Sequence, residues 1–528
     1  PPVKNNSLPT IVNASVSRKS TWSLASLATL MGIFLVFGAS FFAGENGRLQ
    51  AQPNGQLPSV ELKDVDNDGL PDASVETKAL RIIVSSKTGN ISLYYLKGRN
   101  FEENLFPPVL LDFGYAFASD TLAPFEISLS RNLPENSAPS GAQGYTISRE
   151  PSSPDKIVIV AAENSNAQFL GFLKRYHFPT GYAFETETIV TNLGENEAVM
   201  GNAQLGTPGI KVRYGPGLFL DPFNPSSFLA LKPDSQDVFD DPEKFKKGVQ
   251  AGGYTGAGLK TTYFCALMEY KDPVTLTAQK MTVKSNDPKK KEFSGETIEM
   301  ALPPFSLKAK DSRAFNFNFY FGPKLLDELK AIHRDQVTDY GFLSTVLLRI
   351  LQFFNSIYPN YGLSIVFLTI LVRIMLYPLT ISQTKSMAKM QKIQPLVQDV
   401  KDRYKDDPQK FNEEVLKLYQ KHEVNPLGGC LPMFLQLPVL IALYNTINIA
   451  VELRKTPFLW MNDLSKADPI LLLPIAITVL MYYQQGKVSD PQQQQMMAFM
   501  PMFMFVITWS LPSGLLIYWF TSSVIGVF

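Results

Sequence analysis

The chain of 528 residues has few cysteines, few histidines and no excess of either charge. Two cysteines cannot form a disulfide scaffold, and three widely separated histidines indicate neither a zinc cluster nor a histidine-based triad. Lys and Arg number 49 against 48 Asp and Glu, which argues against a dedicated nucleic-acid-binding protein. The chain also lacks the phosphate-binding P-loop motif, so no ATP site and no cofactor are expected.

Charged residues make up 18% of the chain, below the ~25% typical of soluble domains. Residues 22–43 form an uncharged run long enough to cross ~30 Å of hydrocarbon as a helix. Lys4, Arg18 and Lys19 precede this run, so the positive-inside rule places residues 1–21 in the cytoplasm. The alternative is a cleaved signal peptide, but the run exceeds the usual ~7–15-residue signal core and lacks a clear cleavage site. We therefore predict a membrane anchor at 22–43.

Residues 44–77 are rich in Pro, Gly, Asn and Asp and are predicted to form a flexible linker. Within it, Asp64, Asp66 and Asp68 precede Gly69 in the manner of a calcium loop. Val75 stands where the bidentate acid of such a loop is expected. The choice lies between calcium binding over Asp64–Asp72 and a solvated acidic linker, and the missing ligand favours the linker.

Residues 78–322 alternate apolar and polar side chains with a period of two, which predicts strands with one buried face. The pattern occurs at Leu80, Ile82 and Val84, at Ile91, Leu93 and Tyr95, and at Phe315, Phe317, Phe319 and Phe321. Its length and its Gly- and Pro-rich breaks favour a β-sandwich, which follows the anchor and is therefore expected in the periplasm. Residues 323–358 are predicted to be helical. The first of these helices, at 323–335, would either lie on the membrane surface or cap the β-domain.

The remaining chain is predicted to be a bundle of five membrane-spanning helices interrupted by a charged coiled-coil hairpin. The expected spans are 361–380, 428–451, 469–485, 496–511 and 513–528, and the hairpin occupies 381–427. The hairpin is rich in Lys and Arg, so it is predicted to be cytoplasmic, as is the C-terminus. Together with the anchor this makes a six-span inner-membrane protein.

Arg373 is the only charged residue in these five spans. An arginine at the centre of a membrane helix costs roughly 2.5–3.5 kcal/mol and cannot deprotonate. The spans offer no acidic partner, but they do offer neutral polar ones: Gln436, Asn445, Thr446, Asn448, Tyr518, Thr521 and Ser522. This favours a hydrated cavity within the membrane over the alternative, in which Arg373 reaches out to the cytoplasmic interface.

Methionine is concentrated in the span at 496–511, next to several phenylalanines. Flexible, polarizable methionine side chains suit a surface that accepts many apolar partners, although lipid-facing packing explains the pattern equally well. We predict an apolar slide for client segments, formed by Met433, Met500, Phe503 and Met504.

The last 190 residues resemble the YidC/Oxa/Alb family of membrane-protein insertases, in its Gram-negative six-span form. The resemblance rests on five stretches in one order: 372–380, 386–390, 425–432, 436–438 and 511–514. It implies an insertase and folding chaperone, not an enzyme, that works alone or with the Sec translocon. It also implies a cytoplasm-open hydrophilic groove at Arg373, Thr369, Gln436 and Tyr518. Trp519 occupies a groove position that is commonly a second tyrosine in this family.

The same resemblance implies that the hairpin receives nascent clients and meets the ribosome or targeting machinery. The docking residues expected there are Lys385, Lys389, Lys392, Arg403 and Lys405. Two other classes of function would leave different patterns in the sequence. A transporter would show repeated halves around a central site, and a tethered carbohydrate enzyme would need a carboxylate pair in a cleft. The sequence shows neither.

Overall fold

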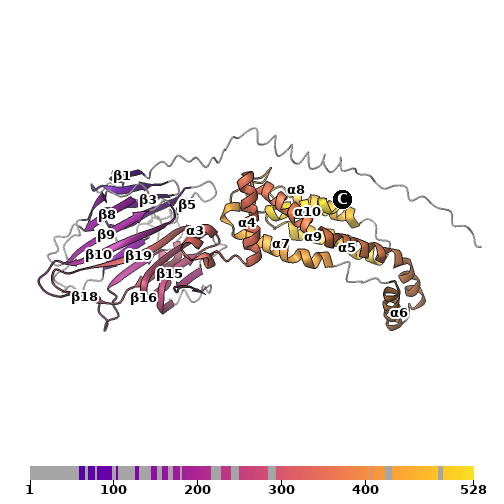
Figure 1. Cartoon of the computed structure of the whole chain (residues 1–528), viewed down its shortest axis with the longest axis horizontal. Coiled ribbons are helices and arrows are strands. Elements are labelled where there is room, and N and C mark those ends of the chain that lie inside the picture. Colours follow the sequence, from indigo (N-terminus) through magenta and orange to yellow (C-terminus); the bar gives the residue numbers. More distant parts are fainter. Residues whose placement is uncertain are drawn as a thin grey trace, which may run out of the picture. The chain divides into compact units, whose positions relative to one another are not determined.

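The computed structural model describes residues 59–65, 69–77, 80–97, 103–104, 125–129, 144–150, 157–163, 170–178, 181–215, 227–239, 249–283, 293–405, 407–422, 431–485 and 491–527. The predicted cytoplasmic N-terminus at 1–21 and anchor at 22–43 lie outside these residues. The described chain begins as β-strands and ends as helices (Figure 1).

Two large antiparallel sheets make up most of the described β-region. The smaller has the order β1 (Ser59–Lys63), β2 (Asp72–Glu76), β3 (Leu80–Val84), β4 (Ile91–Leu96), β5 (Glu103–Asn104). The main path of the larger is β14 (Gln236–Phe239), β13 (Ser227–Leu231), β15 (Val249–Lys260), β16 (Phe264–Val283), β19 (Ser312–Pro323), β10 (Ala183–Asn192), β9 (Leu170–Phe178), β8 (Ile157–Glu163), β7 (Tyr145–Glu150). Three further strands branch from β16: β17 (Phe293–Ala301), β12 (Ile210–Tyr214) and β6 (Phe125–Leu129). A short separate pair is formed by β11 (Ala198–Met200) and β18 (Phe305–Leu307).

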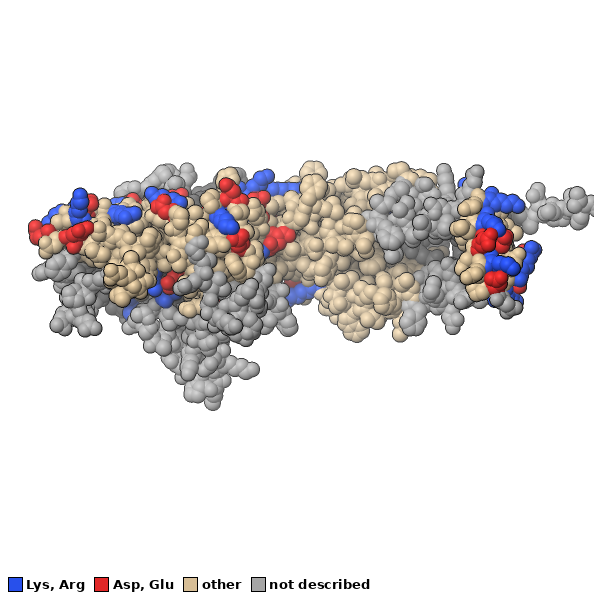
Figure 2. All heavy atoms as spheres, turned by 90° about the horizontal axis from the view of Figure 1, so that it is seen from below, with Lys and Arg blue, Asp and Glu red and all other residues tan. Residues whose placement is uncertain are grey.

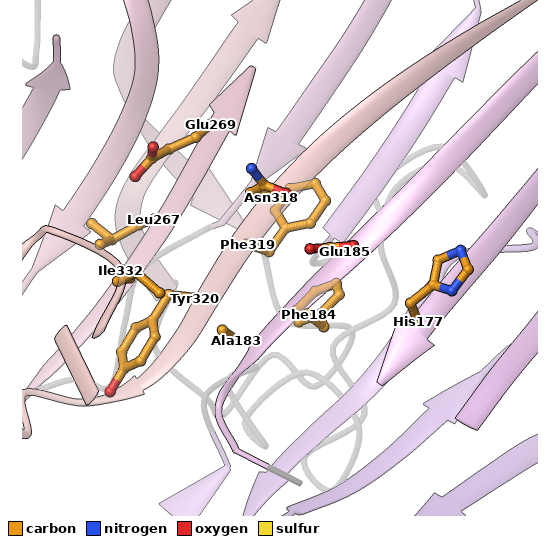
Figure 3. A pocket seen from close by; sticks show the side chains of 10 residues that line it. All are labelled: His177, Ala183, Phe184, Glu185, Leu267, Glu269, Asn318, Phe319, Tyr320 and Ile332. Atoms are coloured by element: carbon orange, nitrogen blue, oxygen red, sulfur yellow. The ribbon is translucent and has the colours of Figure 1, made fainter. Parts of the chain in front are cut away.

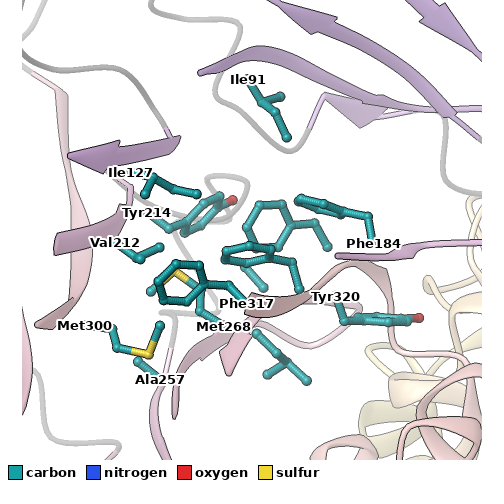
Figure 4. Packing of buried hydrophobic residues seen from close by; sticks show 14 of the residues in the cluster. Ile91, Ile127, Phe184, Val212, Tyr214, Ala257, Met268, Met300, Phe317 and Tyr320 are labelled. Carbon is teal, nitrogen blue, oxygen red and sulfur yellow. The ribbon is translucent and has the colours of Figure 1, made fainter. Parts of the chain in front are cut away.

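Strand β16 joins two parts of the larger sheet. Its first part pairs with β19, and its second part pairs with β17. Aromatic side chains fill the space where these parts and the smaller sheet meet, as Figure 4 shows in part. The Tyr214 ring lies 4.9 Å from that of Phe321, and the Tyr94 ring lies 5.6 Å from Phe321. Sheets packed face to face around such a core have the arrangement of a sandwich.

The alternating patterns mostly identified the buried faces correctly. All four phenylalanines of β19 are buried, as are Leu80, Ile82 and Val84 of β3. The prediction was wrong for β4, where Tyr94 and Leu96 are buried in place of Leu93 and Tyr95. An irregularity in the β3–β4 register between Ile83 and Val84 changes which residues face the core, because a one-residue shift reverses the two faces.

The predicted linker at 44–77 is wrong for residues 59–63 and 72–76, which form β1 and β2. Asp72 is buried and structural: its carboxylate accepts from the backbone N–H and the hydroxyl of Ser86, at 2.7 and 3.0 Å. Asp64 accepts from the backbone N–H of Gly69 at 2.9 Å. Among the described residues, no three His, Cys, Asp or Glu side chains gather as metal ligands. The calcium alternative therefore gains no support from the described part of this loop.

The helix predicted at 323–335 caps the β-domain. It is shorter than expected, with an α-helix α3 (Leu326–Ala331) followed by a 3₁₀ turn η3 (Asp335–Thr338). Leu329 and Val337 are fully buried within the same apolar cluster as the strands. The membrane-surface alternative was wrong because this apolar face is already covered by the β-domain.

Buried charges fasten this cap to the sheet. Asp339, which follows η3, accepts from Lys260 of β15 at 2.6 Å and from Lys324 at 3.1 Å. Burial lowers the pKa of Lys324, and the neighbouring Asp339 carboxylate partly opposes that shift. Lys260 and Lys324 are buried whereas Asp339 is 42% exposed, so removing Asp339 would leave two buried ammonium groups without this carboxylate.

The helical region begins with α4 (Phe342–Ile357) and α5 (Tyr361–Arg403). It continues through α6 (Pro408–Lys421), α7 (Leu431–Ile449), α8 (Leu472–Gln485), α9 (Pro491–Thr508) and α10 (Ser513–Val527). No break separates the expected span at 361–380 from the hairpin: α5 is continuous for 43 residues, about 65 Å of helix, despite Pro378 and Pro395.

Among the described residues, the segment Tyr361–Pro378 is long and apolar enough to cross a membrane by itself. Four shorter apolar helices accompany it: Phe342–Ile357, Gln436–Ile449, Leu472–Tyr483 and Ser513–Gly526. The topology of the remaining predicted spans therefore stays a prediction.

We expect Leu329→Ala to lower the free energy of unfolding of the β-domain by about 2–5 kcal/mol, because it opens a cavity in a closed core. Chemical denaturation monitored by far-UV circular dichroism measures this loss of stability. Leu205→Ala, at a position that is 76% exposed, is the matched control and should change stability little. An unchanged stability for Leu329→Ala would contradict the capping role.

Candidate functional site

Arg373 lies on α5 and points toward α10. Its Nε–H donates to the Ser522 hydroxyl at 2.8 Å, and Nη2 donates to the Ser522 backbone carbonyl at 2.6 Å. A Cβ atom added to Gly526 would lie 3.5 Å from Nη2. Ser522 and Gly526 are four residues apart, so one face of α10 presents both to the guanidinium.

The charge of Arg373 has no carboxylate partner among the described residues. The contacts above use two of its five N–H donors, and both acceptors are neutral. A guanidinium in a low-dielectric region is stabilised by additional acceptors, which water or a bound ligand would supply. Of the seven neutral polar candidates, the structure places Ser522 in hydrogen-bond contact with Arg373, and the hydrated cavity stays a prediction.

The start of α10 sets the position of Ser522. Ser513 is fully buried, its N–H donates to Lys466 O at 2.7 Å, and its hydroxyl donates to Asp463 O at 3.1 Å. The N–H of Gly514 donates to Leu464 O at 2.9 Å. The Pro512–Gly514 break expected from the sequence is thus joined to the loop between α7 and α8, and about two further turns bring Ser522 to Arg373.

Gln436 and Tyr518 form a second polar contact, between α7 and α10. The Gln436 amide donates to the Tyr518 hydroxyl, and Tyr518 is almost completely buried. Tyr518 lies one turn before Ser522, so these two residues share one face of α10. Two helices, α5 and α7, therefore contribute polar groups toward the same stripe of a third.

Thr369 is predicted to line the groove, but the structure does not place it on an open surface. It is fully buried, and its hydroxyl donates to Ile365 O at 2.7 Å within its own helix. Trp519 follows Tyr518 and is partly exposed. Gly526 was missed by sequence reasoning, although its spacing of four from Ser522 could have indicated it.

The predicted apolar slide falls partly on an exposed surface. Met500 and Phe503 of α9 are 47% and 54% exposed, and Met504 is half-buried. For Met433, the structure describes only its place in α7. Exposed large apolar side chains continue along α8 and α9, including Val479, Tyr482, Met502 and Val506. Such a surface requires an apolar environment, either lipid or a client segment.

The charged hairpin is a helix–turn–helix formed by the end of α5 and by α6. Lys389, Lys392 and Arg403 are exposed and form no ion pair with described residues. Lys405 is exposed and pairs with Asp402 at 3.2 Å, and Lys385 is described only by its place in α5. In Figure 2 the coloured charges gather over the β-strands and over the hairpin, whereas the described surface of the other helices is mostly tan.

Two family models together cover most of this chain. The model described as "YidC periplasmic domain" matches residues 72–353, more than half of the chain, and "60Kd inner membrane protein" matches residues 353–528. The chain belongs to the YidC family. The family resemblance noted in the sequence is thereby confirmed.

Among similar proteins, the membrane protein insertase YidC of Geobacter sulfurreducens is 33% identical over 370 residues, covering 67% of this chain and 66% of that protein. The YidC of Tolumonas auensis is 40% identical over 246 residues, covering 44% of this chain and 45% of that one. The chain thus spans about two thirds or less of these relatives. A solved YidC insertase structure covers 95% of this chain and 98% of its own, with 18% identity and a TM-score of 0.37.

Replacing Arg373 by Lys should weaken the packing of α5 on α10, because one ammonium cannot reproduce the two-point contact with Ser522. Cysteine-crosslinking between the two helices, or hydrogen exchange along α10, would show increased opening of this pair. Ser522→Ala should have a smaller effect, because the backbone carbonyl acceptor remains. Equal protection in Arg373→Lys and the unchanged protein would contradict this contact's structural importance.

Proposed function

We propose that this chain is a membrane-protein insertase and folding chaperone of the inner membrane. Hydrophobic segments of nascent membrane proteins enter a hydrophilic groove open to the cytoplasm and leave into the bilayer, either independently or beside the Sec translocon. Membership of the YidC family supports this function. The observation that supports the mechanism is Arg373, a cation in a segment long and apolar enough to cross a membrane, with two neutral acceptors among the described residues.

Arg373 attracts an acidic or otherwise polar client tail. A carboxylate about 4 Å from the guanidinium would gain roughly 4 kcal/mol at an effective dielectric of 20, before the cost of removing both groups from water. A membrane potential that is positive outside adds ~2.3 kcal/mol per negative charge per 100 mV. The tail is thus held temporarily within the membrane while its apolar segment leaves along the exposed face of α9.

The topology proposed with this function has both termini and the hairpin in the cytoplasm and the β-domain in the periplasm. Lys389, Lys392 and Arg403, which form no ion pair with described residues, contribute to the surface that receives clients, the ribosome or the targeting machinery. In this scheme the helical region carries out insertion and the β-domain does not. The function involves no enzymatic reaction.

Arg373→Ala should slow insertion of clients with acidic tails by about tenfold or more, because that tail loses its attracting charge. Clients whose tails are neutral should be affected less, and protease protection of the translocated tail in proteoliposomes measures both. Arg349→Ala is the matched control, since Arg349 pairs with Asp327 outside the groove. An equal loss for both kinds of client would refute the electrostatic role and leave a structural one.

The double substitution Lys389→Glu and Lys392→Glu should reduce client capture several-fold while the spans remain folded, because it reverses charge on the exposed hairpin. Crosslinking to a stalled nascent client at low salt measures capture. The control is the same charge change at Lys271 and Lys308, two exposed positions of the β-domain. Unchanged capture in the hairpin variant would eliminate docking by these lysines.

A further inference from the structure

The β-domain contains a cavity of about 310 Å³ on one face of the large sheet, separate from the proposed groove (Figure 3). Four of its lining residues come from neighbouring strands and are in register. Glu269 of β16 is paired with Asn318 of β19, Asn318 with Glu185 of β10, and Glu185 with His177 of β9. Adjacent strands are ~4.8 Å apart, so these four polar side chains form one continuous row.

A second row lies two residues further along the same strands and is mostly apolar. Leu267 is paired with Tyr320, and Tyr320 with Ala183. Ile332, just after α3, completes this side of the cavity. The cavity therefore has a polar wall beside an apolar wall, and its volume lies at the lower end of the range for small-ligand sites.

The two carboxylates of the polar row differ in their surroundings. The Glu269 carboxylate accepts hydrogen bonds from Nε and Nη2 of Arg334, at 2.7 and 3.0 Å, and Arg334 is itself buried. Glu269 is thus neutralised. Glu185, Asn318 and His177 have no hydrogen bond or ion pair with any described residue, so the centre of the row offers one unneutralised carboxylate flanked by an amide and an imidazole.

We propose that this cavity binds the basic side chain of a polypeptide, arginine in particular. The guanidinium donates to Glu185 and to the Asn318 carbonyl, and the aliphatic stem lies along Leu267, Ala183 and Ile332. A carboxylate matches the planar fork of arginine in two-point geometry, which favours arginine over lysine. The proposal is independent of the insertion function.

Other ligand classes fit the cavity less well. A metal ion would need three converging ligands, and the described residues bring no such group together. A sugar ring usually stacks on an exposed aromatic face, but Tyr320 is buried with its hydroxyl donated to Pro323 O at 2.6 Å. Phe184 and Phe319 are likewise buried in the core.

The test uses the full chain in detergent and the tripeptide acetyl-Gly-Arg-Gly-amide, with citrulline in place of arginine as the neutral isostere. Saturation-transfer NMR titration should show the arginine peptide binding about tenfold more tightly than the citrulline peptide. Glu185→Gln should abolish that difference, whereas Glu187→Gln, two residues along β10 and paired with Arg175, should preserve it. Ala183→Trp should block both peptides by filling the cavity, with circular dichroism verifying its fold.

Three results would overturn the proposal. One is equal binding of the arginine and citrulline peptides, and another is an unchanged preference in Glu185→Gln. The third is displacement of the arginine peptide by a neutral monosaccharide at similar concentration, which would assign the cavity to saccharides.

Discussion

A cation that cannot lose its proton is held between two helices by a neutral residue. The guanidinium of Arg373 is bound by the hydroxyl and carbonyl of Ser522, and neither acceptor cancels its charge. A carboxylate in place of Ser522 would satisfy the arginine more completely and would also cancel the charge on which its proposed attraction for a client depends. The serine instead fixes the orientation of the side chain and leaves its charge available. The start of α10 is positioned separately, because Ser513 is bonded to the loop between α7 and α8.

The β-domain is organised by a different constraint, namely that each strand buries the side chains of one of its faces in the core. Aromatic side chains such as Tyr94, Tyr214 and Phe321 fill the space between the layers, and α3 closes the end of the core. The opposite face of β9, β10, β16 and β19 carries the polar row from Glu269 to His177 beside an apolar row that includes Leu267 and Tyr320. Core and cavity are therefore the two faces of the same strands, and the strand register determines both.

Most of the elements were predictable because their signals are local. The buried phenylalanines of β19, the turn before α6 and the break before α10 each follow from residues adjacent in the chain. The errors arose where distant residues decide. The burial of Leu329 depends on strands of the β-domain, the register irregularity beside β4 changes which residues face the core, and Asp72 is held by Ser86 on the far side of β3.

The candidate site divides in the same way. The amino-acid sequence determined that Arg373 is a charge without an acidic neighbour in its spans, since composition alone shows it, and its motifs indicated the family. Only the tertiary structure decided that Ser522, out of seven polar candidates, contacts the guanidinium. It also decided that Thr369 is buried, with its hydroxyl bonded to a carbonyl of its own helix. The reason is geometric: sequence spacing determines which residues share a helix face, whereas the packing of α5, α7 and α10 determines which of those faces meet.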